Sequence, residues 1–156
     1  MTELVNDPYY WKDRIDQVKR HGLPEHHAIF RCPTDRWLQI EEKHREILRT
    51  HISSDMSVLD VGCGWGRLLT LMPDDWRGEY LGIDISPDFI KDARTRHPSR
   101  RFLVHDLVRQ GAVGGGMDIA ILISIRPMIC RNLGHDYWKA FERAVRASVD
   151  QILYLS

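Results

Sequence analysis

The 156-residue sequence has few cysteines, no surplus of either charge and no long apolar run. Its three cysteines, Cys32, Cys63 and Cys130, are odd in number and far apart, so we expect reduced thiols and neither a disulfide framework nor a metal site. The 22 Lys and Arg are balanced by 22 Asp and Glu, which disfavours general binding to nucleic acid or to an anionic membrane.

Two further absences concern the location of the protein. No charge-free apolar stretch approaches the roughly 20 residues that span a bilayer, and the polar start Met-Thr-Glu-Leu-Val-Asn-Asp does not resemble a signal peptide. The sequence therefore predicts a cytoplasmic protein without a membrane partner. With 43% hydrophobic and 28% charged residues, the composition is that of a globular chain. The length favours a single domain over residues 1–156.

The first part of the chain, residues 1–52, has a helical pattern. Asp7 followed by Pro8 predicts the start of one helix, and Gly22 predicts its end. Thr34 is the predicted N-cap of a second amphipathic helix, whose apolar face includes Trp37, Ile40, Ile47 and Leu48. The loop between these helices contains the adjacent histidines 26 and 27, which we expect to be solvated.

The rest of the chain, residues 53–156, alternates short apolar runs with amphipathic segments. Five buried strands are predicted, at residues 57–61, 79–84, 101–106, 117–125 and 152–155. Helices are predicted at residues 67–72, from Pro87 to His97, and from Asp136 to Ser148. This alternation indicates an α/β fold of the Rossmann-like, doubly wound type, with a mostly parallel sheet, helices on both faces and an N-terminal helical extension. Ligands of such folds bind at the carboxyl ends of the strands.

The first three predicted strands end at or near aspartates, namely Asp60, Asp84 and Asp106. A turn with glycine at 62, 64 and 66 joins the first strand to the next helix, and such a turn lets a ligand approach the backbone closely. An acidic residue at the end of the second strand suits the two hydroxyls of a ribose, so the pattern indicates an adenosine ligand. The glycine spacing differs from the G-x-G-x-x-G of dinucleotide folds, and no phosphate-binding loop of the G-x-x-x-x-G-K-[ST] type is present.

Three motifs in this order resemble the class I S-adenosylmethionine-dependent methyltransferases. They are Val-Leu-Asp-Val-Gly-Cys-Gly-Trp-Gly at 58–66, Tyr-Leu-Gly-Ile-Asp-Ile-Ser at 80–86, and His-Asp-Leu at 105–107. The resemblance covers roughly residues 40–156. It implies a cofactor-binding core over residues 53–156, S-adenosyl-L-methionine as cofactor and S-adenosyl-L-homocysteine as product. Family members commonly have seven strands, so the chain is expected to lack the last one or two, and the uncovered fifth strand suggests a homo-oligomer.

The resemblance also implies a set of cofactor-binding residues at the strand ends. These are Asp60, Gly62, Cys63, Gly64, Gly66, Asp84, Ile85, Asp106, Leu107 and Ser124. By position, Asp84 would hold the ribose hydroxyls, Asp106 and the Leu107 amide would bind the adenine edge, and Ile85 would pack on the adenine face. Asp60 and the glycine turn would lie near the amino-acid part, and Ser124 near the sulfonium.

Other residues keep alternative interpretations. Trp65 is either a cover over the cofactor or an ordinary packing residue, whereas Trp11 is expected in the core and Asp118 in a structural role. Arg126 and Arg131 either bind an acidic acceptor or are solvated.

The predicted function is methyl transfer to an unidentified acceptor, expected to be a small molecule, and no catalytic residue can be named. The two best-marked DNA methylase motifs are absent after Ile125, which disfavours a nucleic-acid acceptor. The alternative hypothesis is a non-catalytic cofactor-binding or regulatory module. A third hypothesis, a nicotinamide-dependent oxidoreductase, is disfavoured by the glycine spacing.

Overall fold

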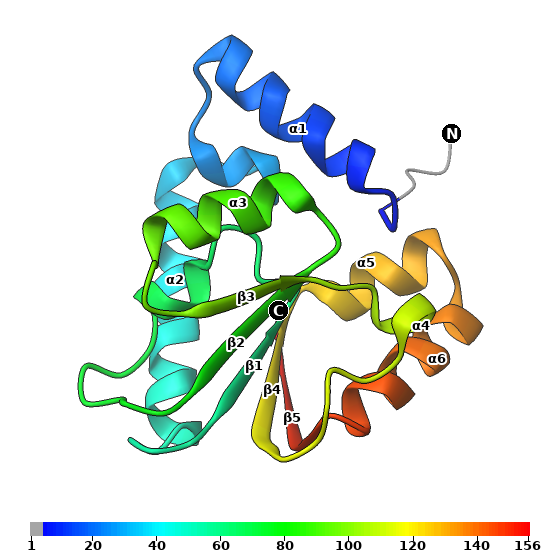
Figure 1. The fold of residues 1–156 in the computed structure, drawn as a ribbon. Coiled ribbons are helices and arrows are strands. Elements are labelled where there is room, and N and C mark those ends of the chain that lie inside the picture. The colour runs from blue at the N-terminus through cyan, green and yellow to red at the C-terminus, as the bar shows by residue number, and fades with distance from the viewer. Residues whose placement is uncertain (1–4) are drawn as a thin grey trace.

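The structure, a computed structural model, describes residues 5–156. Its centre is a five-stranded sheet in the order β3-β2-β1-β4-β5, in which all neighbouring strands are parallel (Figure 1). The strands are β1 (Val58–Val61), β2 (Tyr80–Asp84), β3 (Arg101–Val104), β4 (Met117–Ile123) and β5 (Val149–Leu155). The α/β class and the parallel sheet are therefore as the sequence predicts.

The order of the strands reverses between β1 and β4. From β1 the chain proceeds outward to β2 and β3, and then returns to the other side of β1 to form β4 and β5. Because all strands are parallel, the segments that follow β1 and β4 leave the sheet at the same edge and diverge in opposite directions. This is the place where open α/β sheets bind their ligands.

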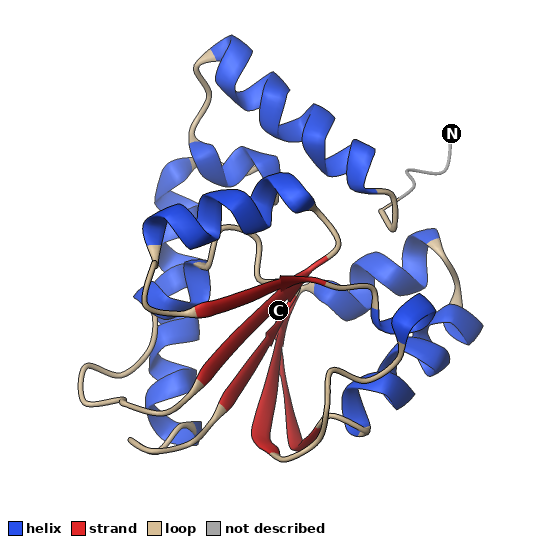
Figure 2. Cartoon of the chain, viewed as in Figure 1, coloured by secondary structure: helices blue, strands red, loops and turns tan. Residues whose placement is uncertain are grey.

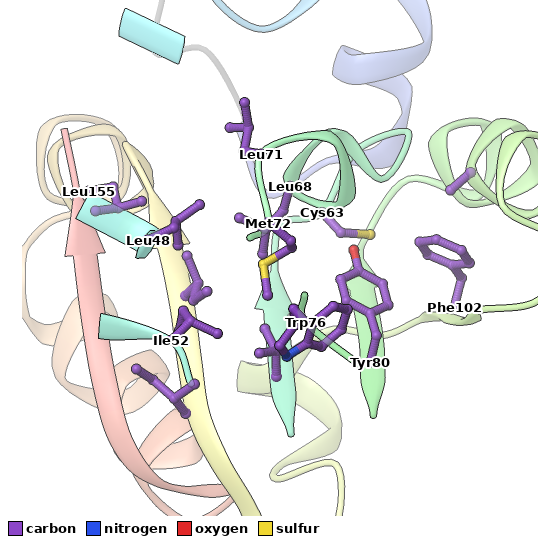
Figure 3. Close-up of a cluster of buried hydrophobic side chains, with 14 of the residues drawn as sticks. Leu48, Ile52, Cys63, Leu68, Leu71, Met72, Trp76, Tyr80, Phe102 and Leu155 are labelled. Carbon is purple, nitrogen blue, oxygen red and sulfur yellow. The ribbon is translucent and has the colours of Figure 1, made fainter. Parts of the chain in front are cut away.

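Helices cover both faces of the sheet (Figure 2). On one face lie α2 (Thr34–His51), the short 3₁₀ helix η2 (Arg67–Thr70) and α3 (Pro87–Arg96). Their buried side chains form one apolar cluster with the strands (Figure 3), including Leu48, Ile52, Cys63, Leu68, Leu71, Met72, Trp76, Tyr80, Phe102 and Leu155. On the other face, α4 (Leu107–Gln110), α5 (Ile125–Asn132) and α6 (His135–Arg146) pack on a second cluster that contains Leu59, Leu81 and Trp138.

The N-terminal helix α1 (Pro8–His21) lies beyond the carboxyl ends of the strands (Figure 1). With the 3₁₀ helix η1 (Glu25–Ala28), it contributes to a third buried cluster, in which Trp11 packs near Phe89 at 6.1 Å between ring centroids. Trp11 is therefore a core residue, as expected. None of the helices in the described part of the chain is long and apolar enough to span a bilayer.

Several predicted helix ends are confirmed. The Asp7 side chain accepts a hydrogen bond from the backbone N–H of Tyr9, and Gly22 ends α1 with a left-handed φ of 60°. Ser86 caps α3 through the backbone N–H of Phe89. The cap assigned to Thr34 was wrong, because Thr34 is already helical and Pro33 precedes it without a side-chain cap.

Other predictions are corrected around the short helices. The predicted helix over 67–72 is only the 3₁₀ turn η2, and β4 ends at Ile123 rather than at residue 125. The helices α4 and α5 were not predicted. The expectation that His26 is solvated was wrong: its ring is buried and stacks on Trp37, with 4.9 Å between ring centroids and an interplanar angle of 9°.

Candidate functional site

The glycine turn after β1 is held against the end of β2. The backbone N–H groups of Gly62 and Cys63 both donate to the carbonyl of Ile83, at 2.8 and 3.0 Å. Gly62, Gly64 and Gly66 have φ values of 71°, 54° and 84°, in the left-handed region that favours glycine. The turn therefore folds back on itself at the switch point of the sheet.

The glycines of this turn serve different purposes. A Cβ on Gly62 would lie 2.4 Å from Cδ1 of Ile125, and one on Gly66 would lie 2.8 Å from the ring of His97, so both are required for packing. A Cβ on Gly64 would meet nothing within 4 Å. Gly64 is thus the position where the turn borders open space.

Asp84, the last residue of β2, binds the backbone of this turn. Its Oδ2 accepts a hydrogen bond from the Gly64 N–H at 2.9 Å, and its Oδ1 accepts one from the Ser86 N–H at 2.9 Å. Burial raises the pKa of Asp84 to about 6. Hydrogen bonds from the backbone N–H groups of Ser86, Gly64 and Ile85 have the opposite, smaller effect on this pKa. The structure thus holds a half-buried carboxylate directly beside the glycine turn.

Asp60 lies within β1 and is more deeply enclosed. Its Oδ2 accepts a hydrogen bond of 2.7 Å from the hydroxyl of Tyr80, and both side chains are buried. Burial raises the pKa of Asp60 to about 7, while the hydroxyl of Tyr80 and the nearby charge of Arg67 lower it. Asp60 therefore changes charge near neutral pH.

This pair predicts a pH-dependent effect of replacing Tyr80 with phenylalanine. Because the pKa of Asp60 is higher in the folded than in the unfolded protein, the folded state favours the protonated carboxyl. The contribution of Asp60 to stability is therefore largest at low pH and is lost as the pH rises through about 7. Without its donor the carboxylate is harder to bury, so we expect Tyr80→Phe to cost about 1.5–3 kcal/mol at pH 8 and about 1 kcal/mol at pH 5.5. Urea unfolding at the two pH values measures the difference.

Tyr154→Phe is the matched control, since that hydroxyl donates to Glu142 on the protein surface. It should change the free energy of unfolding by less than about 0.5 kcal/mol. An equal cost of Tyr80→Phe at both pH values would contradict the assignment of the raised pKa to Asp60.

The segment after β3 places Asp106 at the start of α4. One carboxylate oxygen of Asp106 accepts hydrogen bonds from the N–H groups of Val108 and Arg109, at 2.9 and 3.2 Å. The other lies 3.4 Å from Nε of Arg109. Asp106 is therefore a helix cap, and the buried Leu107 next to it begins α4.

Ser124 lies between β4 and α5 in a conformation unusual for its residue type. Its φ is 57°, and it is the only non-glycine residue with positive φ among residues 5–156. Its backbone N–H donates to the carbonyl of Leu155 at 2.7 Å. Such backbone conformations cost free energy and are concentrated at functional sites.

A cavity of about 550 Å³ joins these elements. Nine of the ten predicted site residues line it: Asp60, Gly62, Cys63, Gly64, Asp84, Ile85, Asp106, Leu107 and Ser124. Gly66 does not, because it packs against His97 and Phe102 instead. The volume is within the range of about 300–1,000 Å³ that is typical of small-molecule sites.

Residues outside the predicted set have defined places. Asp118 accepts hydrogen bonds from the N–H and hydroxyl of Ser57, both at 2.7 Å, at the amino end of β4, which confirms its structural role. Trp65 both packs on Phe89, at 5.7 Å between ring centroids, and lines the cavity. Burial raises the pKa of the Cys63 thiol, so this cysteine is an unreactive wall residue.

The N-terminal helices add cavity residues that sequence reasoning missed, among them Arg14, Trp37 and His44. Within the described residues, Nε of Arg14 and both ring nitrogens of His44 are buried without a hydrogen-bond partner. The sequence did not mark Arg14 or His44 as cavity residues, because a polar residue on an amphipathic helix is normally solvated. These unpartnered groups belong to the part of the cavity that α1 and α2 line.

Comparison with known proteins relates this site to a family. The methyltransferase-domain family matches residues 58–148, which is more than half of the chain. Trans-aconitate 2-methyltransferase of Rhodopseudomonas palustris (strain BisB5) is 29% identical over 75 residues, which cover 44% of this chain and 29% of that protein.

Solved structures agree in fold. Phosphoethanolamine N-methyltransferase 1 of Haemonchus contortus, in complex with phosphoethanolamine and S-adenosylhomocysteine, superposes with a TM-score of 0.65 at 18% identity, over 96% of this chain and 31% of that one. The PH0226 protein of Pyrococcus horikoshii OT3 gives 0.61 at 22% identity, over 85% and 66% of the two chains.

The chain spans less than a third of the length of the first two of these proteins. The match to the family nevertheless includes the glycine turn and all three strand-end aspartates. The chain therefore belongs to the methyltransferase-domain family, among the class I S-adenosylmethionine-dependent methyltransferases.

Proposed function

We propose that this protein binds S-adenosylmethionine in the cavity at the switch point and transfers its methyl group to a small molecule. The observation that carries the proposal is the contact between Asp84 and the N–H of Gly64, at 2.9 Å, in the wall of a 550 Å³ cavity. It supports a role for Asp84 as the acceptor of ribose hydroxyls, because a Cβ on Gly64 would meet nothing within 4 Å. Family membership supports the cofactor, since the related Haemonchus enzyme was solved with S-adenosylhomocysteine.

The adenosine would extend from Asp84 toward α4. A carboxylate accepts two hydrogen bonds from neighbouring hydroxyls, and such charge-assisted bonds are stronger than neutral ones. Ile85 would pack on one face of the adenine, with Asp106 and the Leu107 N–H at its edge. Asp106 keeps acceptor capacity for an amino group, because a carboxylate has about four lone-pair sites.

The amino-acid part would lie between the glycine turn and Ser124. Its ammonium group has Asp60 nearby, whereas its carboxylate needs a positive partner. Arg14 lines the cavity from α1, and its Nη atoms are held by the Tyr10 hydroxyl at 2.9 Å and the His27 carbonyl at 2.8 Å. Its buried Nε is left without a partner among residues 5–156, which makes Arg14 the cation we assign to the cofactor carboxylate.

The transfer itself needs position and exclusion of water more than a dedicated acid or base. The cofactor, when bound, supplies a methyl group on a positively charged sulfur. The walls around Ser124 would align an acceptor with that methyl group, and holding two reactants in line removes much of the barrier. Aromatic residues from α1 and α2, such as Trp11 and Trp37, enclose the space and exclude water.

We propose one domain over residues 1–156, in which segment 1–52 closes the site and segment 53–156 binds the cofactor. Support comes from the buried cluster that joins Trp11 and Ala28 to Trp65 and Phe89. The same enclosure favours a small acceptor over nucleic acid. Among relatives, the Haemonchus enzyme was solved with a small molecule, phosphoethanolamine. A homo-oligomer and a cytoplasmic location are likewise our proposals.

A non-catalytic cofactor-binding module is the second candidate, because none of the described residues that line the cavity is assigned as a catalytic acid or base. Incubation with S-adenosylmethionine labelled in the methyl group and a small-molecule extract separates the two. Label transferred to an extract compound supports the enzyme. Tight cofactor binding without transfer, in the presence of many extracts, supports the module.

Calorimetric titration with S-adenosylhomocysteine tests the site, and we expect its affinity to depend on pH. Ribose and ammonium groups bind the ionised carboxylates, and the pKa values are about 6 for Asp84 and about 7 for Asp60. The affinity should therefore be constant above about pH 8, fall by up to about tenfold per unit between about pH 7 and 6, and fall more steeply below pH 6. Asp84→Asn should remove the additional steepness below pH 6 and leave the fall that Asp60 causes. Absence of binding at pH 8 would reject the proposed function.

A further inference from the structure

The side chain of His44 has a position that cofactor binding does not explain. It lies on α2, is 1% exposed, and lines the cavity. Neither ring nitrogen makes a hydrogen bond of normal geometry within residues 5–156, although the backbone of Ser156 interacts with the ring. Buried polar groups are nearly always paired, and each unpaired nitrogen costs free energy. A histidine kept in this state is expected to have a partner that enters the cavity.

The ring is neutral at physiological pH. Burial lowers the pKa of His44 to about 4, and the charge of Arg67 lowers it further, against the nearby backbone of Ser156. A neutral imidazole presents one N–H donor and one nitrogen acceptor. It therefore suits a group that both donates and accepts, as a hydroxyl does.

The charged groups around His44 are already engaged with one another. The guanidinium of Arg67 pairs with Glu41 at 3.3 Å and lies 4.8 Å from the ring centroid of Trp37. The carboxyl of Asp60 is bound by Tyr80 at 2.7 Å and is also near Arg67. An acceptor with its own net charge would therefore find no free counter-charge on Arg67 or Asp60, and burying it beside them would be costly.

The remaining wall near His44 is apolar. Ile40 and Trp37 come from α2, one and two turns before His44, and Phe30 of the same cavity comes from the segment that precedes α2. These side chains suit an apolar molecular body. His44 is thus the polar group of an otherwise apolar wall, which is the usual composition of a site that orients a small ligand.

We infer that His44 forms an acceptor subsite for a small uncharged molecule with an apolar body and a hydroxyl group. This inference rests on the proposed function, because it gives the methyl acceptor a chemical class. The acceptor nitrogen of His44 would receive the hydroxyl proton in a hydrogen bond. The lone pairs of the hydroxyl oxygen would then face the methyl group near Ser124. As the methyl carbon bonds to this oxygen and its bond to sulfur breaks, the hydroxyl proton would pass to the His44 nitrogen and on to solvent, which leaves a methyl ether and an uncharged thioether.

Three small probes that share a benzene ring test the inference. Their binding is followed by nitrogen-15 NMR of the His44 imidazole, with the protein saturated with S-adenosylhomocysteine. Phenol has the hydroxyl, toluene lacks it, and benzoate carries a charge. We expect phenol to shift the His44 ring signals and to bind His44→Leu about tenfold more weakly than the wild type. Toluene should bind both proteins equally, and benzoate should bind the wild type more weakly than phenol does.

Three variants complete the test. His44→Gln keeps a donor and an acceptor and should bind phenol within about threefold of the wild type. His51→Leu makes the same change at an exposed position of α2 and should bind phenol as the wild type does. His44→Leu should melt no lower than the wild type, because it removes two unpaired buried nitrogens.

Three results would overturn the inference. They are equal affinity of phenol for the wild type and His44→Leu, a preference for benzoate over phenol, and a lower melting temperature of His44→Leu that His44→Gln restores. The first denies the contact, the second indicates an anionic acceptor, and the third indicates a structural histidine. Failure of S-adenosylhomocysteine to bind at all would reject the proposed function instead, and phenol titration without it would still report on the subsite.

Discussion

Asp84→Ala should lower the affinity for S-adenosylhomocysteine by about 100-fold or more at pH 8. The variant removes the acceptor of two ribose hydroxyls, and hydrogen bonds to a charged group contribute about 1.5–3 kcal/mol each. It also releases the N–H of Gly64, which Asp84 holds at 2.9 Å, so the glycine turn loses its support beside the cavity. Calorimetric titration of both proteins at pH 8 measures the loss.

Asp118→Ala is the matched control for this prediction. Asp118 is also a hydrogen-bonded carboxylate of the sheet, but it binds Ser57 at the amino end of β4, away from the cavity. We expect it to reduce stability and to leave the affinity within about twofold of the wild type. If Asp84→Ala retained wild-type affinity while its melting curve showed a folded protein, the ribose assignment would be wrong.

Leu48→Ala should reduce the free energy of unfolding by about 3–5 kcal/mol. Leu48 is 0% exposed on α2 and belongs to the same apolar cluster as Val58 of β1 and Leu155 of β5, near the Leu155 side chain (Figure 3). Truncation removes buried methyl groups and leaves a cavity between the helix and the sheet. Because α2 lies in the segment before residue 53, the loss also tests whether that segment folds together with the sheet. Urea unfolding followed by circular dichroism measures the change.

Leu38→Ala makes the same change ten residues earlier on α2, where the side chain is 58% exposed. It should change the free energy of unfolding by less than about 0.5 kcal/mol. A single cooperative transition at lower urea for Leu48→Ala supports one domain. If Leu48→Ala lost helix signal in a separate step at lower urea, and the sheet unfolded at the same urea concentration as in the wild type, α2 would fold independently.

The predicted strands and the three aspartates agree with the structure because both depend on short-range patterns. Apolar runs bounded by glycine and acidic residues specify buried parallel strands, and the alternation with helices restricts the sheet to a few topologies. Gly62 and Gly64 were recognised from spacing alone, and their positive φ values explain why glycine is present. Gly66 was grouped with them, although its contact is with His97 and Phe102.

The errors occur where distant segments meet. His26 was expected in solvent, yet Trp37 stacks on it. The helix α5 follows β4 so closely that its first residue, Ile125, was assigned to the preceding apolar strand, and the rest of the helix was not predicted. Local propensity does not separate these cases, because tertiary contacts decide them.

The sequence by itself determined the α/β class, the glycine turn and the strand-end carboxylates, since each is a pattern within a few neighbouring residues. Only the tertiary structure decided that Arg14 of α1 and His44 of α2 line the same cavity as Asp84. It also decided the pKa values of about 7 for Asp60 and about 4 for His44, which burial sets. The physical reason is that burial and unpaired hydrogen-bonding groups arise from packing between segments far apart in the chain, which no local pattern records.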